Sequence, residues 1–291
     1  MSERILIIGA GAVGCTVGAA LGDAGHTPAF AVRSRFPYLE RRFGGAVVHY
    51  ETAQFTDPDQ LGDYDFVLIC TKSYHTDGAL KWVRRPLPET TTVAVLQNGV
   101  DHVERLSPYL PSAQLLPAIV QMACERVSPG VAVQPRQGRI CVPDTARGKR
   151  FVALFSDTNA VVARADPNFV SVQWQKLGLN AVNGAICALT LQPNSVLANP
   201  EVNKLAQRLM AEVVAVGRAQ GAEFPSDYID TTLGILTGHA AEHWTSMAAD
   251  RRDGQAMEWE IRNAVVGRLG RRHNIPTPLN DLVTTLLSVA R

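Results

Sequence analysis

A polar stripe in an otherwise apolar stretch is the first sign of chemistry in this sequence. Within residues 169–190, five side chains recur every three or four positions: Gln173, Lys176, Asn180, Asn183 and Cys187. This spacing places them on one side of a helix. Buried polar groups are costly unless satisfied, so the stripe is predicted to face a cleft or to form an internal polar network between two domains. A lysine ammonium in a cleft can stabilise charge developing on an oxygen and protonate that oxygen.

A carboxylate is predicted on the apolar stripe of a second helix, over residues 255–271. By spacing, Glu258 falls on that stripe, where a carboxylate needs a cationic partner or a ligand. The partner is either Arg262, four residues later, or Lys176 from the polar stripe. A carboxylate near the lysine would keep the ammonium charged and oriented.

The N-terminal stretch predicts a dinucleotide-binding turn. An aliphatic run over residues 5–8 is predicted to form a buried strand, and three glycines follow it in the G-x-G-x-x-G spacing. The first glycine allows a tight turn, the second lets a pyrophosphate approach the backbone, and the third lets the next helix pack closely. The N–H groups at the start of that helix would face the phosphates. The residues predicted to bind cofactor here are Gly9, Gly11, Ala12, Val13 and Gly14. The alternative is a glycine-rich turn without a ligand.

The end of the second predicted strand, residues 26–33, indicates which dinucleotide binds. An acidic residue there binds the 2′-hydroxyl of NAD, whereas an arginine accepts the 2′-phosphate of NADP. This chain has Arg33-Ser34-Arg35, and its first acid afterwards is Glu40. The pattern favours NADP(H), and the alternative is a pair of exposed arginines with no ligand.

Two further polar residues follow predicted strands, at residues 65–70 and 92–96. Lys72 and Asn98 lie beyond the carboxyl ends of these strands, where ligands of open parallel sheets bind. A lysine there can meet phosphate or ribose, and an asparagine can hold a nicotinamide or a substrate. The alternative for Asn98 is turn chemistry alone, because Asn-Gly is a turn dipeptide.

Length and composition point to a two-domain globular protein. The chain has 291 residues, 46% of them hydrophobic and 19% charged. Its net charge of +1 produces no field that would gather nucleic acid or anionic lipid. No stretch approaches the length of a membrane span and no signal peptide is evident. The five cysteines form no CxxC pair, which predicts buried thiols in a reducing, cytoplasmic compartment.

The order of predicted elements gives the fold class. Strands and helices alternate through Arg164, with a hairpin around Pro129-Gly130 expected to extend the sheet, and helical patterns follow. We therefore expect an α/β protein with a Rossmann-type parallel-sheet domain, residues 1–166, which binds NADP. An all-helical domain, residues 167–291, is expected to carry the substrate and catalytic residues.

One motif is weighed and set aside. His239-Ala-Ala-Glu242-His243 matches the H-x-x-E-H pattern of a zinc-protease class. Because no third ligand is apparent and the rest of the chain is typical of a nucleotide binder, no metal is predicted.

Several of these motifs together resemble the ketopantoate reductases (2-dehydropantoate 2-reductases) over nearly the whole chain. The motifs are Gly9-x-Gly11-x-x-Gly14, Cys-Thr-Lys72-Ser, Leu-Gln-Asn98-Gly, Pro129-Gly130-x-Val, Lys176-Leu-x-x-Asn180, Thr-Ser246-Met, Met-Glu258-x-Glu-x-x-Asn263 and Ile-Pro-Thr-Pro278-x-Asn280. The resemblance implies a Rossmann domain, a helical C-terminal domain, and NADPH-dependent reduction of a 2-oxo acid in the cleft between them.

The resemblance also implies residue roles. It makes Lys176 the general acid and Glu258 the acidic residue of the active site. Three positions match substrate-binding residues of the family, namely Asn98, Asn180 and Ser246. Three match cofactor-binding residues, namely Arg33, Lys72 and again Asn98. A homodimer is a further expectation.

The chain departs from the family pattern near the expected substrate. Gly184 stands where the family usually has a second asparagine, and Asn183, one residue earlier, points about 100° away on a helix. Cys187 stands where Thr or Ser is common, and Glu260 where Asp is common. Ketopantoate is the favoured substrate, and two alternatives stay open. One is a reductase of a different 2-oxo or β-keto acid, and the other is a non-catalytic NADP(H)-binding sensor.

Overall fold

The computed structural model describes residues 3–238 and 240–290, which divide into two compact units. The first unit contains the described residues up to Asn98 and residues His102–Phe169. The second contains Gly99–Asp101 and the described residues from Val170 onward. A three-residue segment that follows a strand of the first unit is therefore part of the second.

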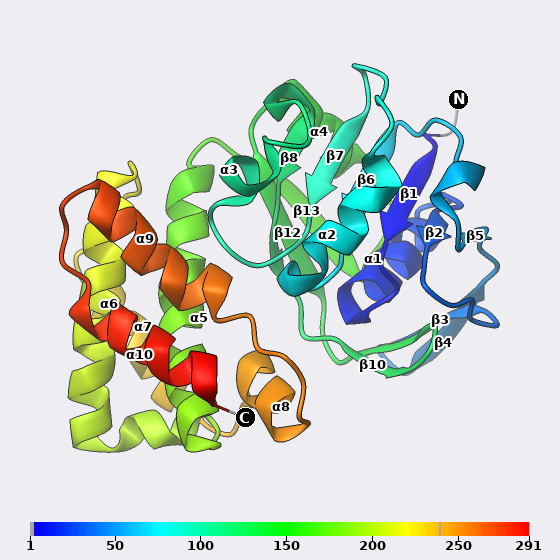
Figure 1. The fold of residues 1–291 in the computed structure, drawn as a ribbon. Coiled ribbons are helices and arrows are strands. Elements are labelled where there is room, and N and C mark those ends of the chain that lie inside the picture. The colour runs from blue at the N-terminus through cyan, green and yellow to red at the C-terminus, as the bar shows by residue number, and fades with distance from the viewer. Residues whose placement is uncertain (1–2, 239, 291) are drawn as a thin grey trace. The chain divides into compact units, whose positions relative to one another are not determined.

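A parallel six-stranded sheet forms the centre of the first unit (Figure 1). In spatial order its strands are β5 (Gln54–Phe55), β2 (Ala29–Ala31), β1 (Ile5–Ile8), β6 (Phe66–Ile69), β7 (Thr92–Val95) and β8 (Leu115–Pro117). The residues of β1, β6 and β7 are buried without exception, as expected for central strands of a parallel sheet. The predicted α/β class with a Rossmann-type sheet is confirmed.

Alternate residues of the central strands pack into two different hydrophobic clusters, one on each face of the sheet. Ile5 and Ile7 pack in a cluster with α1 (Ala12–Asp23) and with Phe151 of α4 (Ala146–Ala153). Leu6 and Ile8 point the other way, into a cluster with α2 (Thr76–Leu80) and α3 (His102–Leu106). This two-residue alternation buries both faces of the sheet, which holds the strand ends in place.

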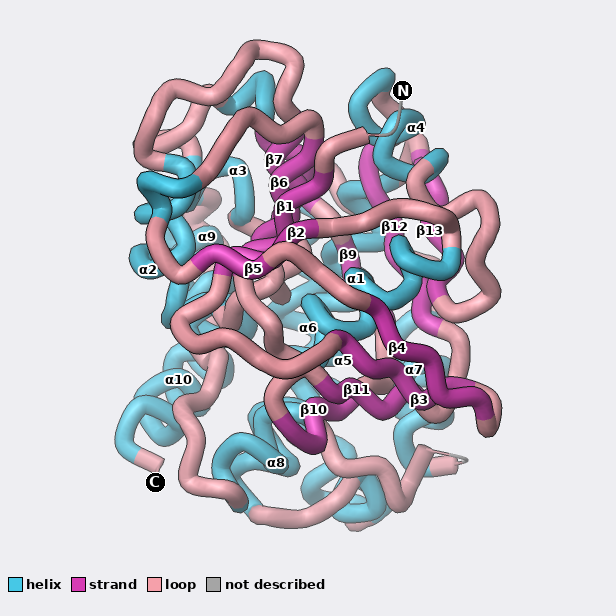
Figure 2. Tube along the Cα trace, turned by 90° about the vertical axis from the view of Figure 1, so that its right-hand side faces the viewer, coloured by secondary structure: helices cyan, strands magenta, loops and turns pink. Residues whose placement is uncertain are grey.

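The hairpin predicted around Gly130 exists, but it does not extend the main sheet. Its strands join a separate four-stranded sheet in the order β10 (Glu125–Ser128), β11 (Val131–Gln134), β3 (Leu39–Phe43) and β4 (Ala46–Tyr50) (Figure 2). The strand β11 pairs in parallel with β3, and both contribute buried residues to the core around α1. The expectation that the hairpin extends the main sheet was wrong, because β11 pairs with β3 and their apolar residues Ala132 and Leu39 are buried in the cluster with α1.

A third sheet completes the first unit. Its strands are, in order, β13 (Val161–Asp166), β12 (Gly138–Pro143) and β9 (Ile119–Gln121). Of the β-rich stretch that begins at Leu115, only β8 belongs to the main sheet.

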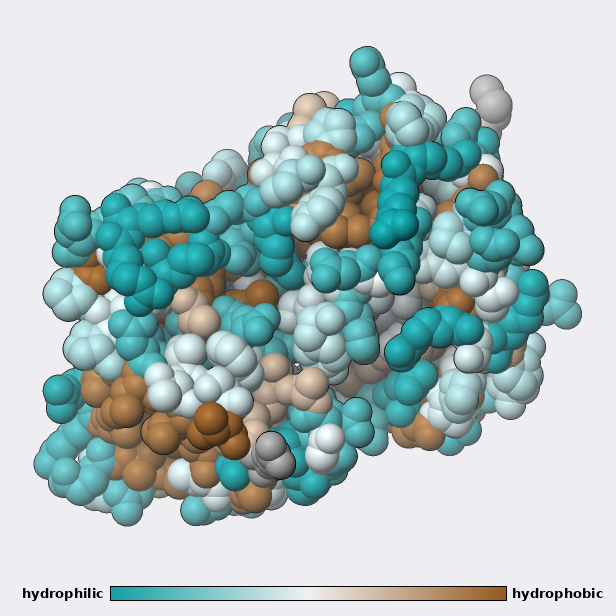
Figure 3. Space-filling view, in the orientation of Figure 1, coloured by the Kyte–Doolittle hydropathy of each residue, from teal (hydrophilic) through white to brown (hydrophobic). Residues whose placement is uncertain are grey.

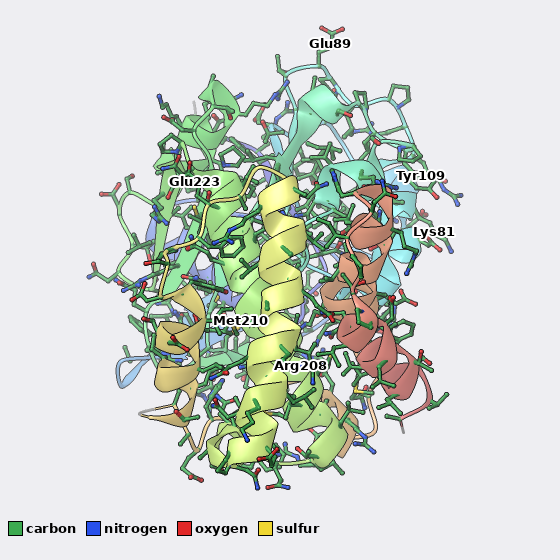
Figure 4. The ribbon with its side chains drawn as sticks, turned by 90° about the vertical axis from the view of Figure 1, so that its left-hand side faces the viewer. Lys81, Glu89, Tyr109, Arg208, Met210 and Glu223 are labelled. Atoms are coloured by element: carbon green, nitrogen blue, oxygen red, sulfur yellow. The ribbon has the colours of Figure 1, made fainter. Side chains whose placement is uncertain are left out.

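The described residues of the second unit form helices joined by loops and turns, with no strand among them. Its helices are α5 (Phe169–Thr190), α6 (Pro200–Ala219), α7 (Tyr228–Thr237), α8 (Ser246–Arg252), a π-helical turn (Glu260–Ala264) continued by α9 (Val265–Arg272), and α10 (Pro278–Val289). The helix α6 is amphipathic, with Met210 fully buried and Arg208 exposed (Figure 4).

The helix predicted over residues 255–271 starts later than expected. Residues 255–259 are irregular, and the N–H of Ala264 donates to the carbonyl of Trp259 at 3.2 Å, five residues back. This wide π turn places Glu258 before the helix rather than inside it. π turns within helices occur frequently at functional sites.

Two asparagines of the family motifs have structural roles. The amide of Asn263 donates to the carbonyl of Ala181 at 3.0 Å and to the side chain of Asn280 at 3.3 Å. Glu212 of α6 in turn accepts two backbone N–H bonds at the start of α10, both at 2.9 Å, and the Asn280 amide at 2.8 Å. The N-cap residue of α10 makes no side-chain hydrogen bond to the helix, so the Glu212 carboxylate serves as the acceptor for two of its first N–H groups.

No helix among the described residues is long and apolar enough to cross a membrane. All five cysteines are free thiols.

Candidate functional site

The turn of residues 9–14 depends on the absence of side chains at two positions. Gly9 has φ of +102°, a conformation that other residues rarely adopt. A Cβ atom at Gly14 would lie 2.0 Å from the carbonyl oxygen of Gly9, so only glycine lets α1 start this close to β1. A Cβ at Gly11 would meet nothing within 4 Å, which leaves open space beside the backbone. We call residues 9–14 the glycine turn.

The first turn of α1 fits a pyrophosphate. Gly11 is its N-cap residue, no side chain caps it, and its first turn carries no acidic residue. Ala12 and Val13, which open the helix, are half-buried. Its first N–H groups therefore keep their hydrogen-bonding capacity for an anion.

The end of β2 fits a 2′-phosphate. Arg33, Ser34 and Arg35 follow this strand, which is the neighbour of β1, and all three are exposed. Glu40, the first acid afterwards, is buried, and it accepts a hydrogen bond from Nε of Arg42 at 2.7 Å. That carboxylate is engaged elsewhere, so it leaves Arg33 available for an anion.

Lys72 and Asn98 each follow one of two neighbouring parallel strands, β6 and β7, and both are half-buried. The side chain of Gln97 joins the two strand ends, because its amide donates to the carbonyl of Thr71 at 3.1 Å. On the other side, Nε2 of buried His102 lies 2.9 Å from the carbonyl oxygen of Gln97 and 3.2 Å from that of Asn98. This network holds the backbone at both positions. Neither Gln97 nor His102 was predicted from the sequence to have this role.

The predicted polar stripe of α5 divides into two parts. Lys176 and Asn180 are half-buried, whereas every residue from 181 to 188 is buried. In that deeper part, Asn183 and Cys187 both donate to the side-chain oxygen of Asn194, at 3.5 and 3.4 Å. These two side chains form an internal polar network within the second unit, so for them the predicted cleft is wrong and the alternative of an internal network holds, although it does not join two domains. Neighbouring helical segments cover the end of α5, and polar groups there need internal partners.

Lys176 lies in a strongly charged environment. The pKa of its ammonium is lowered to about 7, first by burial and then by the nearby Arg262 guanidinium, and the Glu258 carboxylate opposes this shift. A lysine with a pKa near 7 can give up its proton at neutral pH, as a general acid must. Both partners considered for Glu258 are therefore near it.

Arg262 and Glu258 form a buried ion pair, with 3.8 Å between Nη2 and Oε2 and side-chain exposures of 4% and 3%. The Nη2 group also donates to the hydroxyl of Ser246, an exposed residue at the start of α8, at 2.9 Å. We call Lys176, Ser246, Glu258 and Arg262 the charged cluster. The second unit thus gathers an ammonium, a carboxylate, a guanidinium and a hydroxyl. From the sequence, Arg262 was considered only as a partner for Glu258.

The residues of the zinc-protease pattern that the structure describes do not lie on a helix. His239 lies outside them, and Glu242 and His243 stand in turns rather than in a helix. In the described part of the chain, no three His, Cys, Asp or Glu side chains are grouped so that they could hold a metal ion.

Comparison with known proteins agrees with this arrangement of motifs. The family model "Ketopantoate reductase PanE/ApbA" matches residues 5–147, and its C-terminal counterpart matches residues 168–291. A 2-dehydropantoate 2-reductase of Caulobacter vibrioides is 36% identical over 98% of both chains. The crystal structure of a 2-dehydropantoate 2-reductase from Geobacter metallireducens is 27% identical, with a TM-score of 0.91 over 99% of this chain and 100% of the other.

A dimeric ketopantoate reductase from Staphylococcus aureus has the same fold. It is 23% identical with a TM-score of 0.87, over 99% of this chain and 98% of the other. With both family models matched and a full-length relative above 30% identity, the chain belongs to the ketopantoate reductase family.

Proposed function

We propose that the protein is an NADPH-dependent oxidoreductase that reduces 2-dehydropantoate (ketopantoate) to pantoate. The observation that carries this proposal is the environment of Lys176, a half-buried lysine whose pKa is lowered to about 7 and which lies near the carboxylate of Glu258. A reaction that leaves negative charge on a ketone oxygen needs a proton donor of this kind. Membership in the ketopantoate reductase family supports the choice of substrate.

In this proposal the first unit binds the cofactor. The N–H groups of Ala12 and Val13 would hold the pyrophosphate, and Arg33 would hold the 2′-phosphate. Lys72 and Asn98 bind the cofactor from the ends of β6 and β7, where the Gln97 network holds their backbone. When bound, NADPH supplies the hydride that reduces the ketone carbon.

The second unit supplies the proton in this proposal. Lys176 donates from Nζ to the ketone oxygen as charge develops there, and Glu258 keeps the ammonium protonated and oriented until it acts. The substrate is held by hydrogen bonds from Asn98, Asn180 and Ser246. Because Lys176 is partly desolvated, its electrostatic effect on the oxyanion is larger than it would be in solvent.

The test is to follow NADPH absorbance with a panel of 2-oxo and β-keto acids. We expect the largest kcat/KM with 2-dehydropantoate. A larger value with another acid would move the assignment to that substrate, which the departure at Gly184 keeps open. Binding of NADPH with no turnover of any acid would favour a cofactor sensor and overturn the enzymatic proposal.

We also propose that the protein is a cytoplasmic homodimer. Three side chains of α10 are apolar and exposed, namely Leu282, Leu286 and Val289 at 54%, 45% and 72%. Figure 3 shows hydrophobic residues gathered where α10 lies in Figure 1. A second copy is the simplest partner for such a face. The paired substitution Leu282→Glu and Leu286→Glu should give a monomer by sedimentation, and an unchanged mass would exclude this face. The free thiols support a reducing compartment.

A further inference from the structure

The guanidinium of Arg262 has more hydrogen-bonding capacity than its protein partners use. Its Nη2 group donates to Ser246, while Glu258, at 3.8 Å, is beyond hydrogen-bond distance from it. Its Nε atom is buried and has no hydrogen-bond partner among the described residues. A buried donor without a partner is costly, so an unsatisfied N–H of a charged group needs an explanation.

The guanidinium of Arg262 lies beside a residue without a side chain, Gly184. A Cβ atom at Gly184 would lie 3.2 Å from Nη1 of Arg262, so the side chain of Arg262 fills part of the place that a larger residue would take. The family resemblance implies an asparagine at this position. In this chain a missing amide on α5 therefore coincides with a guanidinium that arrives from the π turn.

The surroundings of Arg262 suit an anion that enters from solvent. Ser246, which receives its hydrogen bond, is exposed, so the cluster is reachable at that edge. The Lys176 ammonium and the carboxylates of Glu258 and Asp250 all act on the guanidinium electrostatically, so one anion adds to two positive and two negative groups. A planar guanidinium is the side chain best matched to a carboxylate, because it can donate two parallel hydrogen bonds.

We propose that Arg262, whose guanidinium lies beside Gly184, binds the carboxylate of the 2-oxo acid. This inference rests on the proposed function, since it assigns the substrate carboxylate to a residue outside the family's usual set. Arg262 is then a substrate-binding and specificity-determining residue. Substrates that lack a carboxylate next to the ketone should be rejected mainly through this side chain.

The first test is equilibrium binding of oxamate, an unreactive 2-oxo acid analogue, to the full chain with NADPH present. Arg262→Met should weaken oxamate binding by about 10- to 150-fold, the effect of losing hydrogen bonds to a charged group. Arg271→Met is the matched control, because Arg271 is an exposed arginine of α9 whose ion pair with Asp281 lies at the surface. Oxamide, the neutral analogue, should bind wild type and Arg262→Met equally weakly. Unchanged oxamate affinity in Arg262→Met would overturn the proposal.

The second test uses the reaction itself. For the 2-oxo acid, Arg262→Met should raise KM more than it lowers kcat, whereas for the corresponding 2-oxo amide the two enzymes should have similar kcat/KM. Equal losses with acid and amide would mean that Arg262 only supports Glu258 and Lys176, and would overturn the proposal. Arg262→Lys keeps the charge without the planar fork and should recover only part of the affinity.

A third variant keeps the test valid if Arg262→Met does not fold. Gly184→Asn retains Arg262 but places a side chain against its Nη1 atom, so oxamate affinity should fall; wild-type affinity in this variant would contradict the proposal. The proposed function fails separately. If wild type binds oxamate through Arg262 and reduces no 2-oxo acid, the anion site stands and the reductase assignment does not.

Discussion

The glycine turn of the first unit and the charged cluster of the second differ in what suits each of them to a ligand. The glycine turn acts by what it lacks, since Gly14 leaves room for the carbonyl of Gly9 and Gly11 leaves room for a ligand. The charged cluster acts through side chains whose properties depend on burial, such as Lys176 with its pKa near 7. Backbone geometry is a local matter, whereas desolvation depends on every element packed around a group.

The largest expected effect tests the role of the side chains in the charged cluster. Lys176→Met should lower kcat by about 10²- to 10⁴-fold, because the ketone oxygen loses its proton donor. NADPH affinity, measured by fluorescence titration, should stay within about twofold, since the predicted cofactor residues lie in the other unit. Lys204→Met, at an exposed lysine of α6, is the control. Wild-type kcat in Lys176→Met would remove the acid assignment.

The pH dependence sharpens the same point. Because burial lowers the pKa of Lys176 to about 7, the general acid is protonated below this pH and loses its proton above it. We expect kcat/KM to be level below about pH 7 and to fall by up to about tenfold per pH unit above it. Glu258→Gln should move the midpoint to lower pH, because Glu258 raises the pKa of Lys176. A rate that rises with pH through this range would contradict the mechanism.

Two glycine substitutions test the backbone half. Gly14→Ala places a methyl group against the carbonyl of Gly9, so the unliganded protein should lose about 1–3 kcal/mol of stability, the cost of overpacking. Gly11→Ala meets no protein atom and should leave the melting temperature unchanged while weakening NADPH binding. Calorimetry and NADPH titration of both variants separate these outcomes. Equal NADPH affinity in Gly11→Ala and wild type would mean that no phosphate approaches there.

The smallest expected effect concerns the hydrogen bonds of Glu212 at the start of α10. Glu212→Ala leaves two N–H groups at the start of α10 and the amide of Asn280 without their acceptor. The cost of about 1–3 kcal/mol should lower the melting temperature by roughly 2–10 °C, with kcat little changed. Glu223→Ala, an exposed position labelled in Figure 4, is the control and should melt like wild type.

The sequence by itself determined the parts that depend on local pattern. The glycine spacing after an aliphatic run predicted β1, its turn and α1, because steric requirements act between residues a few positions apart. Periodicity over residues 169–190 likewise predicted α5 with its exact bounds. Lys176 and Glu258 were identified as candidates from residue type, position and family resemblance.

The tertiary structure alone decided how these side chains are used. It turned Asn183 and Cys187 inward to Asn194, because helices packed over the deeper part of α5 leave no open face there. It also moved Glu258 ahead of the π turn and set Arg262 beside Gly184. Helical periodicity describes one helix in isolation, whereas burial, a pKa and the room beside a glycine depend on which distant segments pack against it.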